Sequence, residues 1–384
     1  MKTILKLLAA VAAGIVIGLF ATEGIMGVML VIKQVTGQLI FFLIPLIIIG
    51  FVAPSRAQQK GNVSKVLLFS FGIAYLSSIG AAFFSEGLSK LIVPALHIDP
   101  ATTQPRALPE QVFNLEIPPV MSVMSALVLS VFLGIGTIVS KSEAFDTLLK
   151  DFQKIVLYLV KYILMPLLPF YIAANFACLA YEGNISRLKV FLPVILIVIL
   201  AHYVWLLVLY LIASVYTGKN GWKVVKHYAP AYFTALGTMS SAATLGVSLQ
   251  CAQKSEILDD DTVSYAIPLF ANIHLCGSVL TEVFFVSVTS QLLYGTMPSF
   301  GTMALFIFLL GIFAVGAPGV PGGTVLASLG LVISILGFND AGTALLIALF
   351  ALQDSFGTAC NVTGDGALAL MVQKFKIKNG KENE

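Results

Sequence analysis

The feature that most constrains the fold is a polar stripe within an apolar stretch near the C-terminal end. In the segment Phe350–Lys374, the residues Asp354, Thr358, Asn361 and Asp365 recur at helical intervals. At about 100° per residue, these intervals place all four side chains on one face of a helix. A charged carboxylate at the bilayer centre costs roughly 2.5–3.5 kcal/mol. The stripe therefore predicts a site facing protein, water or an ion, because a stripe that only joins helices would not need acids.

The rest of the chain is apolar enough for a membrane setting. Of its 384 residues, 58% are hydrophobic and 11% are charged, whereas soluble domains carry about twice that charged fraction. The net charge of +3 gives no reason to expect a nucleic acid partner. The four cysteines lack metal-ligand or disulfide spacing and are typical of buried thiols. We predict an all-α polytopic protein of the lipid bilayer.

The first half contains uninterrupted apolar segments. We predict spans at 4–20, 28–52, 65–94, 119–139, 155–179 and 190–215. The first lacks a convincing cleavage site, so we expect it to be retained as a span. Lysine-rich loops follow the second, fourth and sixth spans, and Lys141, Lys150 and Lys154 are placed in one such loop. Because cytoplasmic loops carry excess Lys and Arg, both termini are predicted to be cytoplasmic.

The second half contains apolar segments that are interrupted by Gly, Pro, Ser and Thr. The interruptions are GTMSSAATLG at 237–246, FANIHLCGS at 270–278 and VGAPGVPGGT at 315–324. Such breaks expose backbone groups that lipid cannot satisfy, and paired breaks indicate a transporter's substrate site. We therefore predict two re-entrant helical hairpins, with tips at 238–246 and 316–324, and between them a span that is unwound near 272–278.

The first hairpin tip offers hydroxyl groups at Ser240 and Ser241. A half-helix that starts there would present free N–H groups to an anionic ligand such as a carboxylate. The alternative is a Ser/Thr-rich helix contact. The second tip cannot remain an unbroken helix, because its prolines remove donors and its glycines permit unusual φ angles. Its place in a long apolar stretch indicates a re-entrant gate.

Oxygen ligands for a cation come from the broken span and the stripe. Asn272 and His274 lie in the break, where unwinding frees backbone carbonyls. Together with Asn361 and Asp365, these carbonyls are hard ligands suited to an alkali cation, and no transition-metal cluster accompanies them. A buried histidine is more often a satisfied polar residue than a proton carrier, so a proton-carrying His274 is the alternative.

In chain order, SSAATLG, FANIHLCGS, GVPGG and QDSFGTACNVTGD resemble the dicarboxylate/amino acid:cation symporter family, which has the glutamate-transporter fold. The resemblance covers nearly the whole chain, and NVTGD is its most specific part. It implies eight transmembrane helices plus two re-entrant hairpins, an inverted-repeat architecture and an elevator-type homotrimer. A bacterial-type inner (plasma) membrane is the expected location.

The resemblance also implies a division of the chain. Residues 1–61 and 118–188 would form a scaffold. Residues 62–117, which hold the third span and an outer loop, would join 189–373 in a moving transport domain. Residues 374–384 would form a cytoplasmic tail.

The resemblance assigns roles to the stripe. Asp354 matches the acid that binds the substrate amino group, and Thr358 and Asn361 match side chains that hold the substrate. Asp365 matches a sodium-ligating carboxylate. Asn361, Asn272 and His274 are expected near sodium, partly through backbone carbonyls.

The same resemblance assigns roles to the hairpin tips. Ser241, with its neighbour Ser240, lies in the serine motif whose backbone contacts the substrate carboxylate. Val320 and Gly322 belong to the second tip and are expected beside the substrate.

Three departures from the family pattern bear on the substrate. Gly357 stands where members that take acidic substrates have the arginine that binds the second carboxylate, and it borders the substrate site. Met239 stands at the arginine position of the first hairpin. The usual Asn-Met-Asp of the seventh span reads His-Leu-Cys at 274–276, which puts a third sodium site in doubt. The chain therefore more closely resembles the serine/threonine-type members.

These observations predict a cation-coupled symporter for a small, neutral amino acid, with Na⁺ as the coupling ion and H⁺ as the alternative. A second hypothesis keeps the fold but moves a dicarboxylate or an acidic amino acid. A membrane-embedded enzyme is disfavoured because neither HExxH nor GxSxG occurs, and no cofactor is expected. A channel is disfavoured because re-entrant gates around one site suit alternating access better.

Overall fold

The computed structural model describes residues 2–57, 65–96, 106–110, 113, 115–183, 191–317 and 322–380. In these ranges the chain forms helices and connecting segments but no strand. The α-helices are α1 (Lys2–Phe20), α2 (Glu23–Ala57), α3 (Lys65–Ile92), α4 (Val123–Ser140), α5 (Glu143–Leu159), α6 (Met165–Tyr181), α7 (Phe191–Thr217), α8 (Trp222–Val225), α9 (Ala229–Thr238), α10 (Ser241–Gln253), α11 (Asp260–Ile273), α12 (Cys276–Tyr294), α13 (Phe300–Gly316), α14 (Gly323–Ser334) and α15 (Asp340–Gly380).

The expected all-helical, multi-pass architecture is confirmed. Six helical stretches in the described part are long and apolar enough to cross a bilayer, and shorter apolar stretches occur in α1, α4, α13 and α14. The last of the long stretches contains the polar stripe. The expected total of eight spans stays a prediction.

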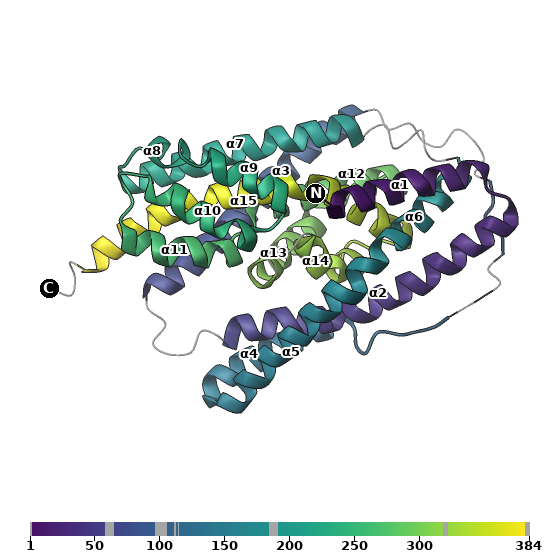
Figure 1. The fold of residues 1–384 in the computed structure, drawn as a ribbon, viewed down its shortest axis with the longest axis horizontal. Helices are drawn as coiled ribbons and strands as arrows, with labels where there is room; N and C mark the ends of the chain where they lie inside the picture. The colour runs from purple at the N-terminus through teal and green to yellow at the C-terminus, as the bar shows by residue number, and fades with distance from the viewer. Residues whose placement is uncertain are drawn as a thin grey trace.

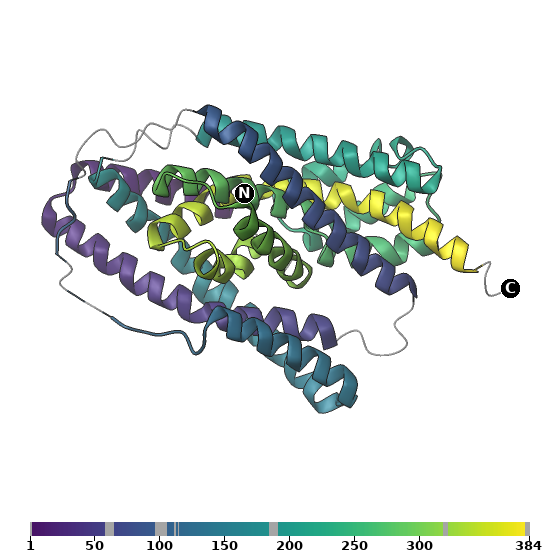
Figure 2. The same ribbon diagram turned by 180° about the vertical axis from the view of Figure 1, so that it is seen from behind.

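The helices form two groups by their contacts. Helices α1, α2, α4, α5 and α6 pack on one another, whereas α3, α7, α12 and the helices α9–α11 gather around α15 or its neighbours. Figures 1 and 2 show α15 running from the middle of the molecule to one end, with α9, α10 and α11 around its C-terminal half. Helices α13 and α14 lie between the two groups and contact α2 as well as α3 or α15. The division into scaffold and transport domain stays a prediction.

Each predicted interruption coincides with helix ends. Helix α9 stops at Met239, whose φ of 54° is left-handed, and Ser240 then caps α10 by accepting the Ala243 N–H at 3.2 Å. The long seventh segment breaks between α11 and α12, at His274 and Leu275. Helix α14 starts after Gly322, whose φ is 73°. The rest of the second tip, 318–321, lies outside the described residues, and Val320 lies with it.

The expected loop at 141–154 is wrong in the structure, where most of it is helix α5. Ser142 caps the helix by accepting the Phe145 N–H at 3.3 Å. The charges that suggested a loop form pairs along the helix, Lys150 with Asp146 at 3.0 Å and Lys154 with Asp151 at 2.8 Å. A π-helical turn at Val160–Leu164 then joins α5 to α6. A charged and amphipathic helix therefore precedes the apolar span.

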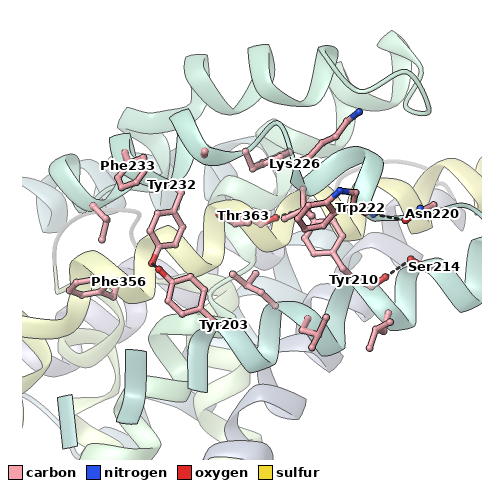
Figure 3. A pocket seen from close by; sticks show the side chains of 17 residues that line it. Tyr203, Tyr210, Ser214, Asn220, Trp222, Lys226, Tyr232, Phe233, Phe356 and Thr363 are labelled. Atoms are coloured by element: carbon pink, nitrogen blue, oxygen red, sulfur yellow. Dashed lines mark hydrogen bonds between the residues drawn. The ribbon is translucent and has the colours of Figure 1, made fainter. Parts of the chain in front are cut away.

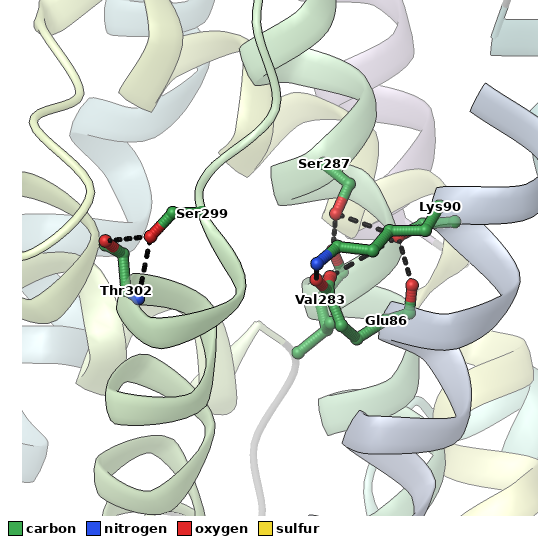
Figure 4. A network of polar contacts seen from close by, with 7 residues as sticks. Glu86, Lys90, Val283, Ser287, Ser299 and Thr302 are labelled. Carbon is green, nitrogen blue, oxygen red and sulfur yellow. Dashed lines mark hydrogen bonds and ion pairs between the residues drawn. The ribbon is translucent and has the colours of Figure 1, made fainter. Parts of the chain in front are cut away.

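Small polar residues hold α3 against the second half of the broken span (Figure 4). Ser85 Oγ donates to the Leu280 carbonyl at 2.7 Å. Ser89 Oγ donates to Ser287 Oγ at 3.0 Å, within the network of Figure 4. On α3, Glu86 pairs with Lys90 at 3.0 Å. Interhelical bonds from small residues are typical of packing inside a membrane, where helices lack a hydrophobic drive to associate. This contact places α3 beside α12.

Helix α1 packs unusually close to α6. A Cβ added at Gly14 would lie 2.3 Å from the Ala173 carbonyl oxygen, and one at Gly18 would lie 2.2 Å from the Ala177 carbonyl oxygen. Small residues at such a crossing allow two backbones to approach. The two glycines therefore set the separation of α1 and α6.

We predict that Gly14→Ala lowers stability by roughly 1–3 kcal/mol, because the added methyl group forces the helices apart. The matched control is Gly72→Ala in α3, where a Cβ meets nothing within 4 Å. That substitution should be neutral or stabilising by about 0.5–1 kcal/mol, because alanine favours a helix. Unfolding of the detergent-solubilised protein measures both changes, and equal shifts for the two variants would contradict the close crossing.

Candidate functional site

The polar stripe of α15 faces the interior of the protein. Asp354, Thr358, Asn361 and Asp365 are all at most 4% exposed. Three of the four bond to other elements: Asp354 to the second hairpin tip, and Asn361 and Asp365 to the two sides of the α11–α12 break. The stripe thus brings together two of the three elements that the sequence marks by interruptions.

Asn361 caps helix α12 from a different helix. Its Oδ1 accepts the Gly277 N–H at 2.7 Å and the Ser278 N–H at 3.3 Å, while its Nδ2 donates to Ser278 Oγ at 2.9 Å. The first N–H groups of a helix have no partner within it, and Leu275, which precedes α12, provides no side-chain cap. Asn361 is therefore a positioning residue for the break. Its direct contact with substrate or sodium stays a prediction.

Asp354 binds the tip of the second hairpin. Its Oδ2 accepts the Gly322 N–H at 2.6 Å. Gly322 has a positive φ, which allows the chain to turn into α14 at this point. Asp354 and Gly322, both expected at the substrate, therefore lie together. The remaining lone pairs of the carboxylate can accept further donors.

His274 lies between α3 and α15. Its Nδ1 is 2.9 Å from Asp365 Oδ1, its Nε2 is 2.9 Å from Ser77 Oγ, and its side chain is fully buried. The other oxygen of the carboxylate, Asp365 Oδ2, is buried with no hydrogen-bond partner among the described residues. Asp365, the acid expected to bind sodium, therefore has one carboxylate oxygen in contact with the His274 imidazole. Its other oxygen has no donor among the described residues.

Glycines allow α15 to approach the break. A Cβ at Gly277 would lie 2.5 Å from the Gly357 carbonyl oxygen, and one at Gly357 would lie 3.3 Å from Ser278 N and Cα. A Cβ at Gly364 would lie 2.9 Å from Cε1 of His274. Gly357 therefore borders the break as a packing position, and any larger residue there needs a small shift of the α12 backbone.

The structure does not bring the Asn272 side chain to this cluster. Asn272 is exposed, and its Nδ2 donates to the Pro268 carbonyl one turn earlier in α11. The side chain is therefore not a sodium ligand in this arrangement, and a role for the Asn272 backbone carbonyl near sodium stays a prediction. Ser240 caps α10, and Ser241 is buried in the first turn of that helix, which contacts α15.

Sequence reasoning missed several buried residues beside the site. His202 in α7 places Nε2 3.0 Å from the Gly277 carbonyl oxygen and 2.9 Å from Thr281 Oγ1. Glu282 in α12 accepts a hydrogen bond from Ser328 Oγ in α14. Each is a lone ionisable residue in an apolar run, and this signal marks an intramembrane functional candidate.

We predict that His274 and Asp365 behave as one unit in a double-mutant cycle. Residues in contact show coupling energies of about 0.5–3 kcal/mol, so His274→Ala combined with Asp365→Asn should lose less stability than the two single losses added. In the control cycle, Asp340→Asn, at the exposed start of α15, takes the place of Asp365→Asn. Its change in unfolding free energy should add to that of His274→Ala. Chemical unfolding in detergent gives the values, and additivity in the first cycle would remove the interaction.

Comparisons with known proteins identify the family of the chain. A family model described as the sodium:dicarboxylate symporter family matches residues 4–375. The chain is similar to excitatory amino acid transporter 1 of Homo sapiens, with 27% identity over 62% of this chain and 44% of the relative. It is also similar to excitatory amino acid transporter 3 of Mus musculus, with 31% identity over 45% of this chain and 33% of the relative. The chain thus matches about half or less of the length of these relatives.

Proposed function

Because the chain belongs to the sodium:dicarboxylate symporter family, we propose that it is a secondary active transporter. It couples the movement of a cation, sodium, to the symport of a small neutral amino acid by alternating access. The observation that carries this proposal is the buried stripe of α15, which meets the second hairpin tip and the break between α11 and α12. A transporter needs its substrate groups beside elements that can move, and the stripe supplies that arrangement. An enzymatic activity is not part of the proposal.

The substrate amino group binds Asp354 in this proposal. An ammonium donates to lone pairs of the carboxylate that Gly322 does not use, so substrate and tip can share one acid. The substrate carboxylate binds at the first turn of α10, where Ser240 and Ser241 lie and where a helix N-terminus favours an anion. Thr358 lies one turn after Asp354 on the same face of α15 and completes the substrate contacts.

The coupling cation binds through Asp365. Its Oδ2 is buried without a partner in the described part of the chain, so an oxygen is available for sodium. Backbone carbonyls freed at the break, including that of Asn272, are further hard ligands. The family description, which names sodium, supports this ion.

A proton is the second candidate for the coupling ion, and one contact favours it. His274 lies 2.9 Å from Asp365. An imidazolium there would neutralise the carboxylate that sodium requires, whereas a neutral imidazole would leave the carboxylate charge available. Proton-coupled symport would therefore use the same two residues.

We also propose the assembly and orientation that family membership suggests. Residues 1–61 and 118–188 form the scaffold of a homotrimer, and 62–117 with 189–373 form the moving domain. The protein lies in a bacterial-type inner membrane with both termini in the cytoplasm. The contact groups support the division, and the lysines after the second and sixth predicted spans support the orientation.

The proposal of a neutral substrate rests on the absence of arginine at two positions. Gly357 and Met239 offer no guanidinium to a second carboxylate. A buried carboxylate without a partner costs several kcal/mol in desolvation, so aspartate and glutamate should bind poorly. The alternative, an acidic amino acid or dicarboxylate, is the chemistry that the family description and the names of the relatives suggest.

Uptake of labelled serine into proteoliposomes tests the function, with a sodium or a proton gradient imposed separately. We expect uptake with the sodium gradient, and a loss of about one to two decades in apparent affinity for Asp354→Asn, because a hydrogen bond to a charged group contributes roughly 1.5–3 kcal/mol. Asp340→Asn, on the same helix but exposed, is the matched control and should transport normally. Uptake driven by the proton gradient alone would assign coupling to the second candidate, and normal affinity in Asp354→Asn would remove that acid from the site.

Competition between serine and aspartate for the unmodified protein tests selectivity. We expect serine, threonine or alanine to compete far better than aspartate. Gly357→Arg should then raise the affinity for aspartate relative to serine, because a guanidinium can bind a carboxylate through two hydrogen bonds. Gly357→Ala is the control for steric crowding, because its Cβ would lie 3.3 Å from the Ser278 backbone but it adds no charge. An effect of Gly357→Arg that Gly357→Ala lacks is therefore an effect of the guanidinium. Tighter binding of aspartate or succinate than of every neutral amino acid would refute the neutral substrate.

A further inference from the structure

A large groove lies along α7, away from the polar stripe's contacts with α12 (Figure 3). Its volume is about 740 Å³, and its walls come from α7, the α8 turn, α9 and one face of α15. Its lining is mainly aromatic and aliphatic, and includes Tyr203, Leu207, Tyr210, Trp222, Lys226 and Tyr232. Nothing in the proposed transport cycle uses this space.

The body of the groove is apolar and open to the side. It follows α7 from Tyr203 to Ser214, which at 1.5 Å per residue is about 16 Å. Half of a bilayer's hydrocarbon core is about 15 Å thick, so the groove has the length of an acyl chain in one leaflet. Leu207 and Leu211 in its wall are 61% and 54% exposed. These side chains therefore contact lipid wherever α7 spans the membrane.

One end of the groove is positively charged. Lys226 lines it, is exposed, and forms no ion pair within the described ranges. Trp222 and Asn220 lie at the same end, as Figure 3 shows. Tryptophan and lysine are typical of the level where hydrocarbon meets headgroups. An anionic headgroup would complement this charge.

The inner wall of the groove is closed to polar ligands. Tyr228 and Thr363 line it, but both side chains are at most 4% exposed and their hydroxyl oxygens are buried. Tyr210 OH donates to the Thr363 carbonyl at 2.8 Å. The groove therefore offers a ligand an apolar wall along α7 and a positive charge at Lys226.

We propose that this groove binds an anionic phospholipid. The phosphate lies at Lys226, and one acyl chain follows α7 toward Tyr203. A zwitterionic lipid carries a cation that would meet Lys226 unfavourably, so the site discriminates by headgroup. The proposal rests on the membrane setting of α7 and is independent of the transported substrate.

The test compares dioleoyl phosphatidylglycerol with dioleoyl phosphatidylcholine, added to the delipidated protein in detergent. Native mass spectrometry counts bound lipid, and thermal melting follows stabilisation. We expect phosphatidylglycerol to bind at least about fivefold more tightly, the effect of one lysine near an anionic headgroup. Lys226→Gln should abolish this preference, whereas Lys223→Gln, an exposed lysine of the same turn that does not line the groove, should keep it.

A second pair of variants tests the acyl-chain part of the groove. Leu207→Trp should fill the groove and weaken binding of phosphatidylglycerol, whereas Leu200→Trp, which is 64% exposed on α7 and does not line the groove, should not. Equal binding of the two lipids by the unmodified protein would overturn the proposal without any variant. Equal effects of Lys226→Gln and Lys223→Gln, or of the two tryptophan variants, would also overturn it.

Discussion

The close crossing of α15 over the break between α11 and α12 is the contact on which the rest of the structure depends. Helix α12 starts deep in the protein, where its first N–H groups cannot reach water. Asn361 supplies their acceptor, and the absence of side chains at Gly277 and Gly357 lets the two backbones come close enough for that bond. A break in a membrane helix is tolerable only with such replacement partners. The interrupted span therefore exists because α15 crosses it.

The same polar residues maintain the fold and supply the chemistry. Asp354 binds the second hairpin tip and Asp365 binds His274, so both acids already hold protein donors at the places where ligand groups are proposed to bind. Fully connected polar networks rigidify a buried site, whereas a single unpartnered atom makes it costly. Among the residues that the structure describes, Asp365 Oδ2 is such an atom, so the cluster is rigid on one side and unsatisfied on the other. A cation at that oxygen would complete the network.

Features that depend on local sequence could be predicted, and features that depend on partners could not. The helix ends at Met239 and at His274 follow from Gly, Ser and Thr in apolar runs, and the stripe follows from helical periodicity. Asn272 lies in the last turn of α11 and His274 lies beyond its end, so the direction of the Asn272 side chain depends on where that helix stops. The resemblance already grouped His274 with Asp365. The contact of His274 with Ser77 joins two distant segments, and a single sequence contains no local signal for it. The helix at α5 was missed because paired charges were interpreted as a loop.

The length of the joined α5–α6 helix has a consequence for how the protein sits in its bilayer. The stretch Glu143–Tyr181 contains 39 residues, or about 58 Å at 1.5 Å per residue, whereas a hydrocarbon core is about 30 Å thick. The mismatch is too large to be absorbed by the ordinary tilt of a spanning helix. The charged first part, with Lys150 and Lys154, must therefore extend into the headgroups or the water beyond. Because α5 packs on α2, the bilayer surface cuts across a helix pair that continues beyond it. A thicker membrane would then cover more of α5 and draw its charged residues toward the hydrocarbon.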